Sequence, residues 1–133
     1  MTEDPSHQAR VDRVNAAMSK AIDATVEQQI KAAGADVAPR ITPADIEANI
    51  DAENTFTVGA ACEALGHPVH DSHKLLTICV LVLKNGFTVT GESACASPEN
   101  FDAELGRKIA RANAVNKVWP LMGYELRSKL AGS

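Results

Sequence analysis

The sequence predicts a small α+β protein, in which an antiparallel β-hairpin or small sheet packs with several helices, including long N-terminal and C-terminal helices. Three patterns predict this class: an apolar run over residues 75–84 before Asn85-Gly86, and helical periodicity over 8–33 and again from about residue 98. The 133 residues are 45% hydrophobic, which suffices for one modest core and excludes collagen-like, disordered and disulfide-scaffold classes. We expect a helical arm over 1–37 and an α+β core over 38–133.

Apolar residues recur at three- and four-residue spacing in the predicted arm helix, which ends at Gly34. They are Val11, Val14, Met18, Ala21, Ile22, Thr25, Val26, Gln29 and Ile30. The stripe is thin and rich in alanine, so we expect it to pack on the core or on another subunit.

A short helix is predicted over about 43–50, because Thr42 can cap it, Pro43 fits its first position and Asp45 favours its positive end. Residues 55–58 could open a strand. We favour a second short helix there, with Val58, Ala61, Cys62 and Leu65 on one side and Gly66 at its end.

The hairpin is the clearest local signal, with strands over 75–84 and 87–90 joined by the two-residue turn Asn85-Gly86. That turn would place residue 82 opposite residue 89, so that Ile78, Val80 and Val82 share a face with Phe87 and Val89, while Cys79, Leu81 and Leu83 lie beside Thr88 and Thr90. The first strand is apolar on both faces, and two strands alone are marginally stable. Either residues 54–61 supply a third strand or a neighbouring subunit completes the sheet, and we favour an oligomer.

The C-terminal helix is predicted to start at Ser97-Pro98-Glu99, with Ser97 as its cap, and to run to about Val118. Pro120 is expected to stop or kink it before a weaker segment over 121–130. Its inner side is predicted to carry Phe101, Leu105, Ile109, Ala112 and Trp119.

Net charge, hydropathy and cysteine content restrict which partners the protein can bind and in which compartment it works. The net charge of −4 does not favour nucleic acid, and no apolar run is long enough for a membrane span. Residues 1–72 hold five Lys/Arg against twelve Asp/Glu, whereas residues 73–133 hold eight against five, so the two halves can attract each other within or between subunits. Cys62, Cys79 and Cys95 form no CxxC pair, which favours a reducing cytoplasm.

Five blocks of residues resemble an uncharacterised tailed-phage protein family that is labelled by gene 49 of one phage and gene 66 of phage Sf6. The resemblance covers about residues 40–130 and rests on Ile41-Thr42-Pro43-Ala44-Asp45-Ile46-Glu47, Asn85-Gly86-Phe87-Thr88-Val89-Thr90-Gly91, Ser97-Pro98-Glu99-Asn100-Phe101-Asp102, Gly106-Arg107-Lys108-Ile109-Ala110-Arg111, and Trp119-Pro120-Leu121 with Gly123-Tyr124. It implies a phage or prophage product in the cytoplasm of a bacterial host. It implies no activity and no catalytic residues.

One helical face is the candidate ligand site. Arg107 and Arg111 lie four residues apart, with Lys108 adjacent, and Asn100 continues their face. Guanidinium groups and free N–H groups at a helix start suit a small phosphorylated ligand. Phe101, Phe87 or Trp119 would offer a stacking plane. In the simpler interpretation, Glu104 pairs with Lys108 at the surface, and the arginines pair with Asp102 or with a neighbour's acidic half.

A metal or catalytic site is less supported. His67, His70 and His73, with Asp71 and Cys62 nearby, are weak zinc candidates, and a solvated loop is the preferred interpretation. No GxSxG, Walker, dinucleotide or HExxH motif occurs, so no enzyme activity and no cofactor is indicated.

These patterns favour a non-catalytic phage accessory protein, a homo-oligomer that binds a small anionic ligand, for example a nucleotide signal of host defence. The alternatives are a module that inhibits or adapts a host or phage protein, a metal-dependent hydrolase or nuclease built on the histidine loop, and a minor virion or assembly protein.

Overall fold

The computed structural model describes residues 26, 28, 29 and 38–132. Val26, Gln28 and Gln29 are helical, and the rest of the predicted helix over 8–33 lies outside the described residues. From residue 38 onward the elements are α2 (Pro43–Ala48), β1 (Ile50–Thr57), α3 (Val58–Ala64), the 3-10 helix η1 (Asp71–Leu75), β2 (Leu76–Leu83), β3 (Thr88–Ala94), the 3-10 helix η2 (Pro98–Asn100) and α4 (Ala103–Gly132). The α+β class is therefore confirmed.

Helix α2 begins as the sequence predicts. The Thr42 hydroxyl accepts a hydrogen bond from the Asp45 N–H, the Asp45 carboxylate accepts one from the Thr42 N–H, and Pro43 is the first helical residue. The helix ends at Ala48, slightly earlier than predicted, and Ile46 points into the core.

The chain supplies its own third strand. Within the described residues, the strands form an antiparallel sheet in the order β1-β2-β3. The third strand is Ile50–Thr57 rather than 54–61, because the chain turns directly from strand into helix α3 at Thr57, whose hydroxyl accepts from the Ala60 N–H. The preferred short helix ending at Gly66 is therefore present, and residues 55–57 before it are strand.

The register of the hairpin differs from the prediction by one residue. Val82 pairs with Thr88 and Leu81 with Val89. The loop contains Lys84 as well as Asn85 and Gly86, because the Gly86 N–H donates to the Leu83 carbonyl and only Gly86 takes a positive φ of 89°.

This one-residue shift moves every side chain of β3 to the opposite face. Val89 joins Cys79, Leu81 and Leu83 on the side that faces α4, whereas Thr88 and Thr90 lie beside Ile78, Val80 and Val82. The predicted sharing of a face by Phe87, Val89 and the even-numbered residues of β2 is wrong.

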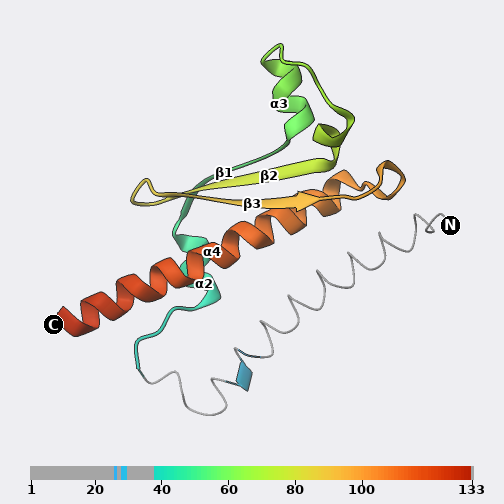
Figure 1. Cartoon of the computed structure of the whole chain (residues 1–133). Helices are drawn as coiled ribbons and strands as arrows, with labels where there is room; N and C mark the ends of the chain where they lie inside the picture. The colour runs from blue at the N-terminus through green and yellow to red at the C-terminus, as the bar shows by residue number, and fades with distance from the viewer. Residues whose placement is uncertain (1–25, 27, 30–37, 133) are drawn as a thin grey trace.

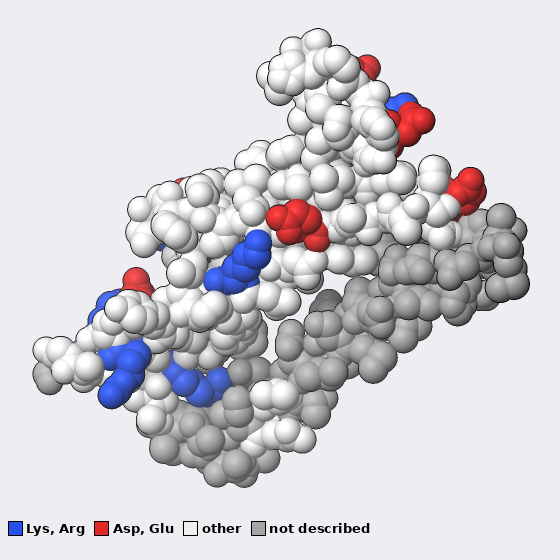
Figure 2. Space-filling model, in the orientation of Figure 1, with Lys and Arg blue, Asp and Glu red and all other residues white. Residues whose placement is uncertain are grey.

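Helix α4 lies along one face of the sheet and extends beyond it toward the C-terminus (Figure 1). Most of the lysine and arginine side chains seen in Figure 2 lie toward this C-terminal end. The other face of the sheet has no α4, and α3 rises from the end where β1 finishes and β2 starts (Figure 1). The molecule thus has a helix layer, a sheet layer and one sheet face that α4 does not cover.

The start and end of α4 differ from the prediction. Ser97 forms no side-chain cap, and its hydroxyl instead contacts Glu99. Residues 98–100 form η2. The cap of α4 is Asp102, whose carboxylate accepts a hydrogen bond from the Leu105 N–H at 3.0 Å. The helix continues through Pro120 to Gly132 without a separate second segment. Pro120 and Asn116 are both exposed, so the Asn116 carbonyl that loses its N–H partner lies on the solvent side, where water can satisfy it.

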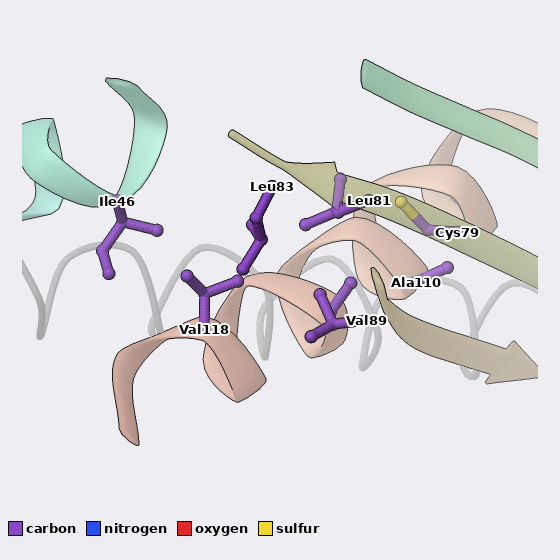
Figure 3. Packing of buried hydrophobic residues seen from close by; sticks show 8 residues of the cluster. Ile46, Cys79, Leu81, Leu83, Val89, Ala110 and Val118 are labelled. Atoms are coloured by element: carbon purple, nitrogen blue, oxygen red, sulfur yellow. The ribbon is translucent and has the colours of Figure 1, made fainter. Parts of the chain in front are cut away.

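The core lies between α4, the sheet and α2 (Figure 3). Its buried residues are Ile46, Cys79, Leu81, Leu83, Val89, Ala110, Ala114 and Val118, with Trp119 partly buried against them. Ala112, which was predicted to lie on the inner side, is exposed, because the inner stripe runs through Leu105, Ala110, Ala114 and Val118 instead.

Candidate functional site

Arg111 joins three elements through two carboxylates. Its Nη1 and Nη2 donate to the two carboxylate oxygens of Glu47 at 3.0 and 2.7 Å, and its Nε donates to Oε1 of Glu53 at 2.8 Å. Glu47 belongs to α2, Glu53 to β1 and Arg111 to α4. The two-oxygen contact uses the planar fork that only arginine presents, so the guanidinium fixes the positions of α2 and β1 relative to α4.

The electrostatics of this cluster follow from the same contacts. The hydrogen bonds from Arg111 hold the pKa of the Glu47 carboxyl below its ordinary value, and partial burial opposes this only in part. Glu47 and Glu53 in turn raise the pKa of Arg111 above its ordinary value. Glu47 and Arg111 are therefore both charged at neutral pH, and the carboxylates already offset the charge of Arg111.

Arg107 and Lys108 lie on the exposed side of α4, before Arg111. Lys108 forms a surface pair with Glu104 at 3.4 Å, as the simpler interpretation predicts. Among the described residues, none forms an ion pair with Arg107. Of the two predicted arginines, Arg107 is thus the one whose guanidinium faces solvent.

The other predicted ligand residues lie at separate places. Asn100 and Phe101 line a hollow where α4 begins. Phe87 lines a second hollow, at the hairpin tip, together with Leu121 and Met122 from the far part of α4. Trp119 is partly buried against the core and lies roughly 18 Å along the helix from Arg107. The structure therefore does not gather the predicted ligand residues into one pocket.

Two histidine side chains of the histidine loop accept hydrogen bonds from the backbone of the same loop. The Nδ1 atom of His70 accepts from the Ser72 N–H at 3.0 Å, and Nδ1 of His73 accepts from the His70 N–H at 2.9 Å. These bonds form the cap of η1. In the described part of the chain, no group of three or more His, Cys, Asp or Glu side chains is placed to hold a metal ion.

The attraction between the acidic and basic halves occurs within one chain. Besides the Arg111 cluster, Lys84 of the hairpin loop pairs with Asp51 of β1 at 3.1 Å. Across residues 38–132, no helix has the length and apolar character that crossing a membrane requires.

Sequence reasoning missed one surface, which we call the open face. It is the side of the sheet opposite α4, and the strand register places on it Ala52, Asn54, Phe56, Ile78, Val80, Val82, Thr88, Thr90 and Glu92. Phe56 is 39% exposed, and Ile78, Val80 and Val82 are half-buried. The sequence does contain a signal for this surface, because the first hairpin strand is apolar on both faces. Which side chains of β1 and β3 share each face with that strand depends on the register.

Comparison with known proteins identifies the family without assigning an activity. The searches of the curated proteins and of the solved structures return no match. Residues 41–130 match the family described as "Phage protein (N4 Gp49/phage Sf6 gene 66) family". This match spans both strands of the hairpin, the Arg111 cluster and nearly all of α4, so the chain belongs to the phage N4 Gp49/phage Sf6 gene 66 protein family.

Proposed function

We propose that this phage-family protein is a non-catalytic protein-interaction module of the bacterial cytoplasm, and that its open face binds an uncharged, apolar surface of a host or phage protein. The observation that carries the proposal is the character of β2, which is apolar on both sides although α4 covers only one of them.

The chemistry of the open face indicates the kind of partner. Phe56, Ile78, Val80 and Val82 form an apolar strip across β1 and β2, and Thr88 and Thr90 border it on β3. The apolar strip itself is uncharged, and the exposed carboxylate of Glu92 lies beside it, opposite Ile78, so the strip and its β3 border offer no cation to nucleic acid. A flat strip of branched and aromatic side chains gains binding free energy mainly by leaving water.

The test is a pair of isosteric changes on the same face. V80T/V82T keeps the side-chain shape and β-propensity but makes the strip polar, whereas T88V/T90V extends the strip. A partner captured from infected cells should lose at least about tenfold in affinity for V80T/V82T and gain affinity for T88V/T90V. Exposed Ala112, changed to Ser, serves as the control on another surface.

Thermal unfolding and native mass accompany the binding measurement. If a captured partner binds V80T/V82T as tightly as the unchanged protein, the open face is not the binding surface. A shift from oligomer to monomer in V80T/V82T would identify a second copy of the chain as the occupant. Loss of the protein from purified particles in the same variant would identify a virion partner.

A second proposal, an anionic ligand such as a nucleotide of host defence, is favoured by the solvent-facing Arg107 beside Lys108. A nucleotide panel should raise the thermal midpoint of the unchanged protein but not that of R107E. K117E, also exposed on α4, is the matched control. Equal responses of R107E and K117E would remove Arg107 from the site.

A further inference from the structure

Strand β3 lies at an edge of the sheet and pairs with β2 on one side only. Just beyond one end of β3, the Cys95 N–H donates to the Leu75 carbonyl, and just before its other end the Phe87 carbonyl accepts from the Leu83 N–H. The register between these two bonds is regular. Because hydrogen-bonded and non-hydrogen-bonded pairs alternate along an antiparallel ladder, the odd-numbered residues of β3 bond to β2 and the even-numbered residues do not.

The free edge of β3 is formed by the backbone groups of Thr88, Thr90 and Glu92, which point away from β2. One of these groups shows this direction independently, because Nδ2 of Asn113 on α4 donates to the Glu92 carbonyl at 2.7 Å, as the N–H of a fourth strand would. Within the described residues, the outward N–H and C=O groups of Thr88 and Thr90 have no hydrogen-bond partner. The edge therefore offers alternating donors and acceptors to an extended chain.

The other edge strand, β1, is protected in ways that β3 is not. Its pairing with β2 shifts register between Ile50 and Ala52, and it carries the charged residues Asp51 and Glu53. Bulges and charged side chains are devices that keep an edge from pairing with another chain. Strand β3 has a regular register and Glu92 is its only charged residue.

Helix α4 decides which kind of chain can pair with the free edge. It lies directly under β3, because a Cβ atom at Gly91 would overlap backbone atoms of Ala110 and Ala114 (Figure 1). Paired strands lie about 4.8 Å apart, whereas packed helices need about 8–10 Å between their axes. A second copy that paired through its own β3 would bring two α4 helices too close together. An extended segment with no helix beneath it fits.

The side chain of Glu92 indicates the charge of that segment. Glu92 is exposed, and its carboxylate forms no ion pair within residues 38–132. Its side chain lies on the same side of the sheet as those of Thr88 and Thr90. Oppositely charged side chains on adjacent strands attract each other when they lie directly opposite. A complementary segment therefore has a cationic residue opposite Glu92 and uncharged residues opposite the two threonines.

We propose that the free edge of β3 is a docking site for one extended segment of a partner protein, which pairs antiparallel with residues 88–92 and carries a lysine or arginine opposite Glu92. Main-chain hydrogen bonds supply the affinity in this kind of recognition, and the side chains supply the selectivity. The inference goes beyond the proposed function, because it requires neither the apolar strip nor the partner of that strip.

The test uses synthetic peptides as the added strand. The lysine peptide is Ac-Thr-Lys-Thr-Val-Thr-Val-Thr-NH2, which in antiparallel pairing places its lysine opposite Glu92 and its valines opposite Thr90 and Thr88. In ¹⁵N–¹H spectra of the full chain, we expect saturable shifts of the Thr88 and Thr90 amides, slower hydrogen exchange at both, and a dissociation constant of about a millimolar. The same peptide N-methylated at both valines lacks the N–H donors and should not bind.

Variants of the protein separate backbone pairing from side-chain contact. T90P removes one outward N–H without removing a bond to β2, and it should weaken binding of the lysine peptide at least about tenfold. T90V keeps the backbone donor and should bind the lysine peptide. Near-native spectra of Cys79 and Leu81 check that T90P is folded, and the N-methylated peptide tests the same hydrogen bonds in the unchanged protein.

A charge exchange tests the role of Glu92. E92K should weaken the lysine peptide severalfold, and a peptide with glutamate in place of the lysine should bind E92K better than it binds the unchanged protein. E63K makes the same charge change at an exposed residue of α3 and should leave binding of both peptides unchanged.

Three results would overturn the proposal. They are an absence of saturable shifts at Thr88 and Thr90 with the lysine peptide, equal binding of the N-methylated peptide, and a dimer in native mass spectra that T90P dissociates, which would make a second copy the occupant. Because V80T/V82T leaves the backbone of β3 unchanged, failure at the edge and failure of the open-face proposal are distinguishable.

Discussion

Gly91 of β3 lies directly against Ala110 of α4, with no space for a side chain between strand and helix. A Cβ atom at Gly91 would overlap the carbonyl oxygen of Ala110 and the backbone nitrogen of Ala114, and it would lie 2.9 Å from the Cα atom of Ala114. Ala110 and Ala114 are fully buried and are themselves small. The glycine and the two alanines together let α4 approach the sheet closely enough to bury the side of β2 that carries Leu81.

We therefore expect Gly91→Ala to destabilise the protein by at least about 3 kcal/mol, because the obstructing atoms are backbone and cannot rotate away. The measurement is the free energy of unfolding from a urea titration. Gly123→Ala is the control, because Gly123 belongs to α4, the helix that packs on Gly91, and nothing lies within 4 Å of its Cβ position. Alanine there should stabilise α4 by up to about 1 kcal/mol. Equal effects of the two changes would contradict the close packing.

The Arg111–Glu47 pair should contribute modestly to stability. The Arg111 side chain is 33% exposed and that of Glu47 is 55% exposed, so solvent screens their attraction. A double-mutant cycle of Arg111→Ala and Glu47→Ala should give a coupling free energy of about 0.5–1 kcal/mol. Arg111→Lys should lose most of this coupling, because an ammonium cannot reproduce the two-oxygen contact. A coupling free energy near zero would mean that the contact between Arg111 and Glu47 neutralises charge without stabilising the fold.

The same pair predicts a pH dependence. The pKa of Glu47 lies below its ordinary value in the folded protein, so its contribution to stability is full above the ordinary value of 4.5 and is lost as the pH falls through the folded-state pKa. The difference in unfolding free energy between the unchanged protein and Glu47→Gln should therefore be constant near neutrality and shrink as the pH falls below the ordinary value of 4.5 and through the lower folded-state pKa. A difference that grows on acidification would contradict the assigned direction.

Local sequence patterns were sufficient where the stabilising contacts are local. The Thr42–Asp45 cap and the short helix before Gly66 depend on residues three or four positions apart, and both are present. The hairpin strands were also predicted, but not their register. Asn-Gly favours a two-residue turn, and the choice of a three-residue loop that includes Lys84 puts Val89 into the core against α4.

Long-range partners could not be predicted in the same way. The spacing of Arg107 and Arg111 gave their shared helical face, but the carboxylates that bind Arg111 lie 64 and 58 residues earlier in the chain. The charge asymmetry between the two halves of the chain indicates that acidic and basic side chains attract each other. It does not indicate which residues form the ion pairs. The sequence predicts Asn100 as a ligand residue, yet its burial and its unpartnered oxygen follow only from how η2 packs beside α4.

The loop at the hairpin tip gives a direct test of the register. Gly86 has a φ of 89°, where a Cβ atom is strained. Gly86→Ala should cost about 1–2 kcal/mol in unfolding free energy, and Gly86→Asn less, because asparagine tolerates this conformation better. Cross-strand nuclear Overhauser contacts between Val82 and Thr88 should persist in Gly86→Asn. Contacts between residue 82 and Val89 would instead indicate the two-residue turn.

Cysteine reactivity should report on the opening of the core. Cys79 is fully buried, and burial raises the pKa of its thiol, whereas Cys62 and Cys95 are half-buried. Because the thiolate is the reacting form, iodoacetamide should modify Cys62 and Cys95 first in the folded protein, as peptide mass spectrometry would show. Modification of Cys79 then requires the sheet to separate from α4, so Gly91→Ala should accelerate it far more than Gly123→Ala does. If Cys79 reacts as fast as Cys95 in the unchanged protein, the packing of β2 against α4 is not as the structure describes.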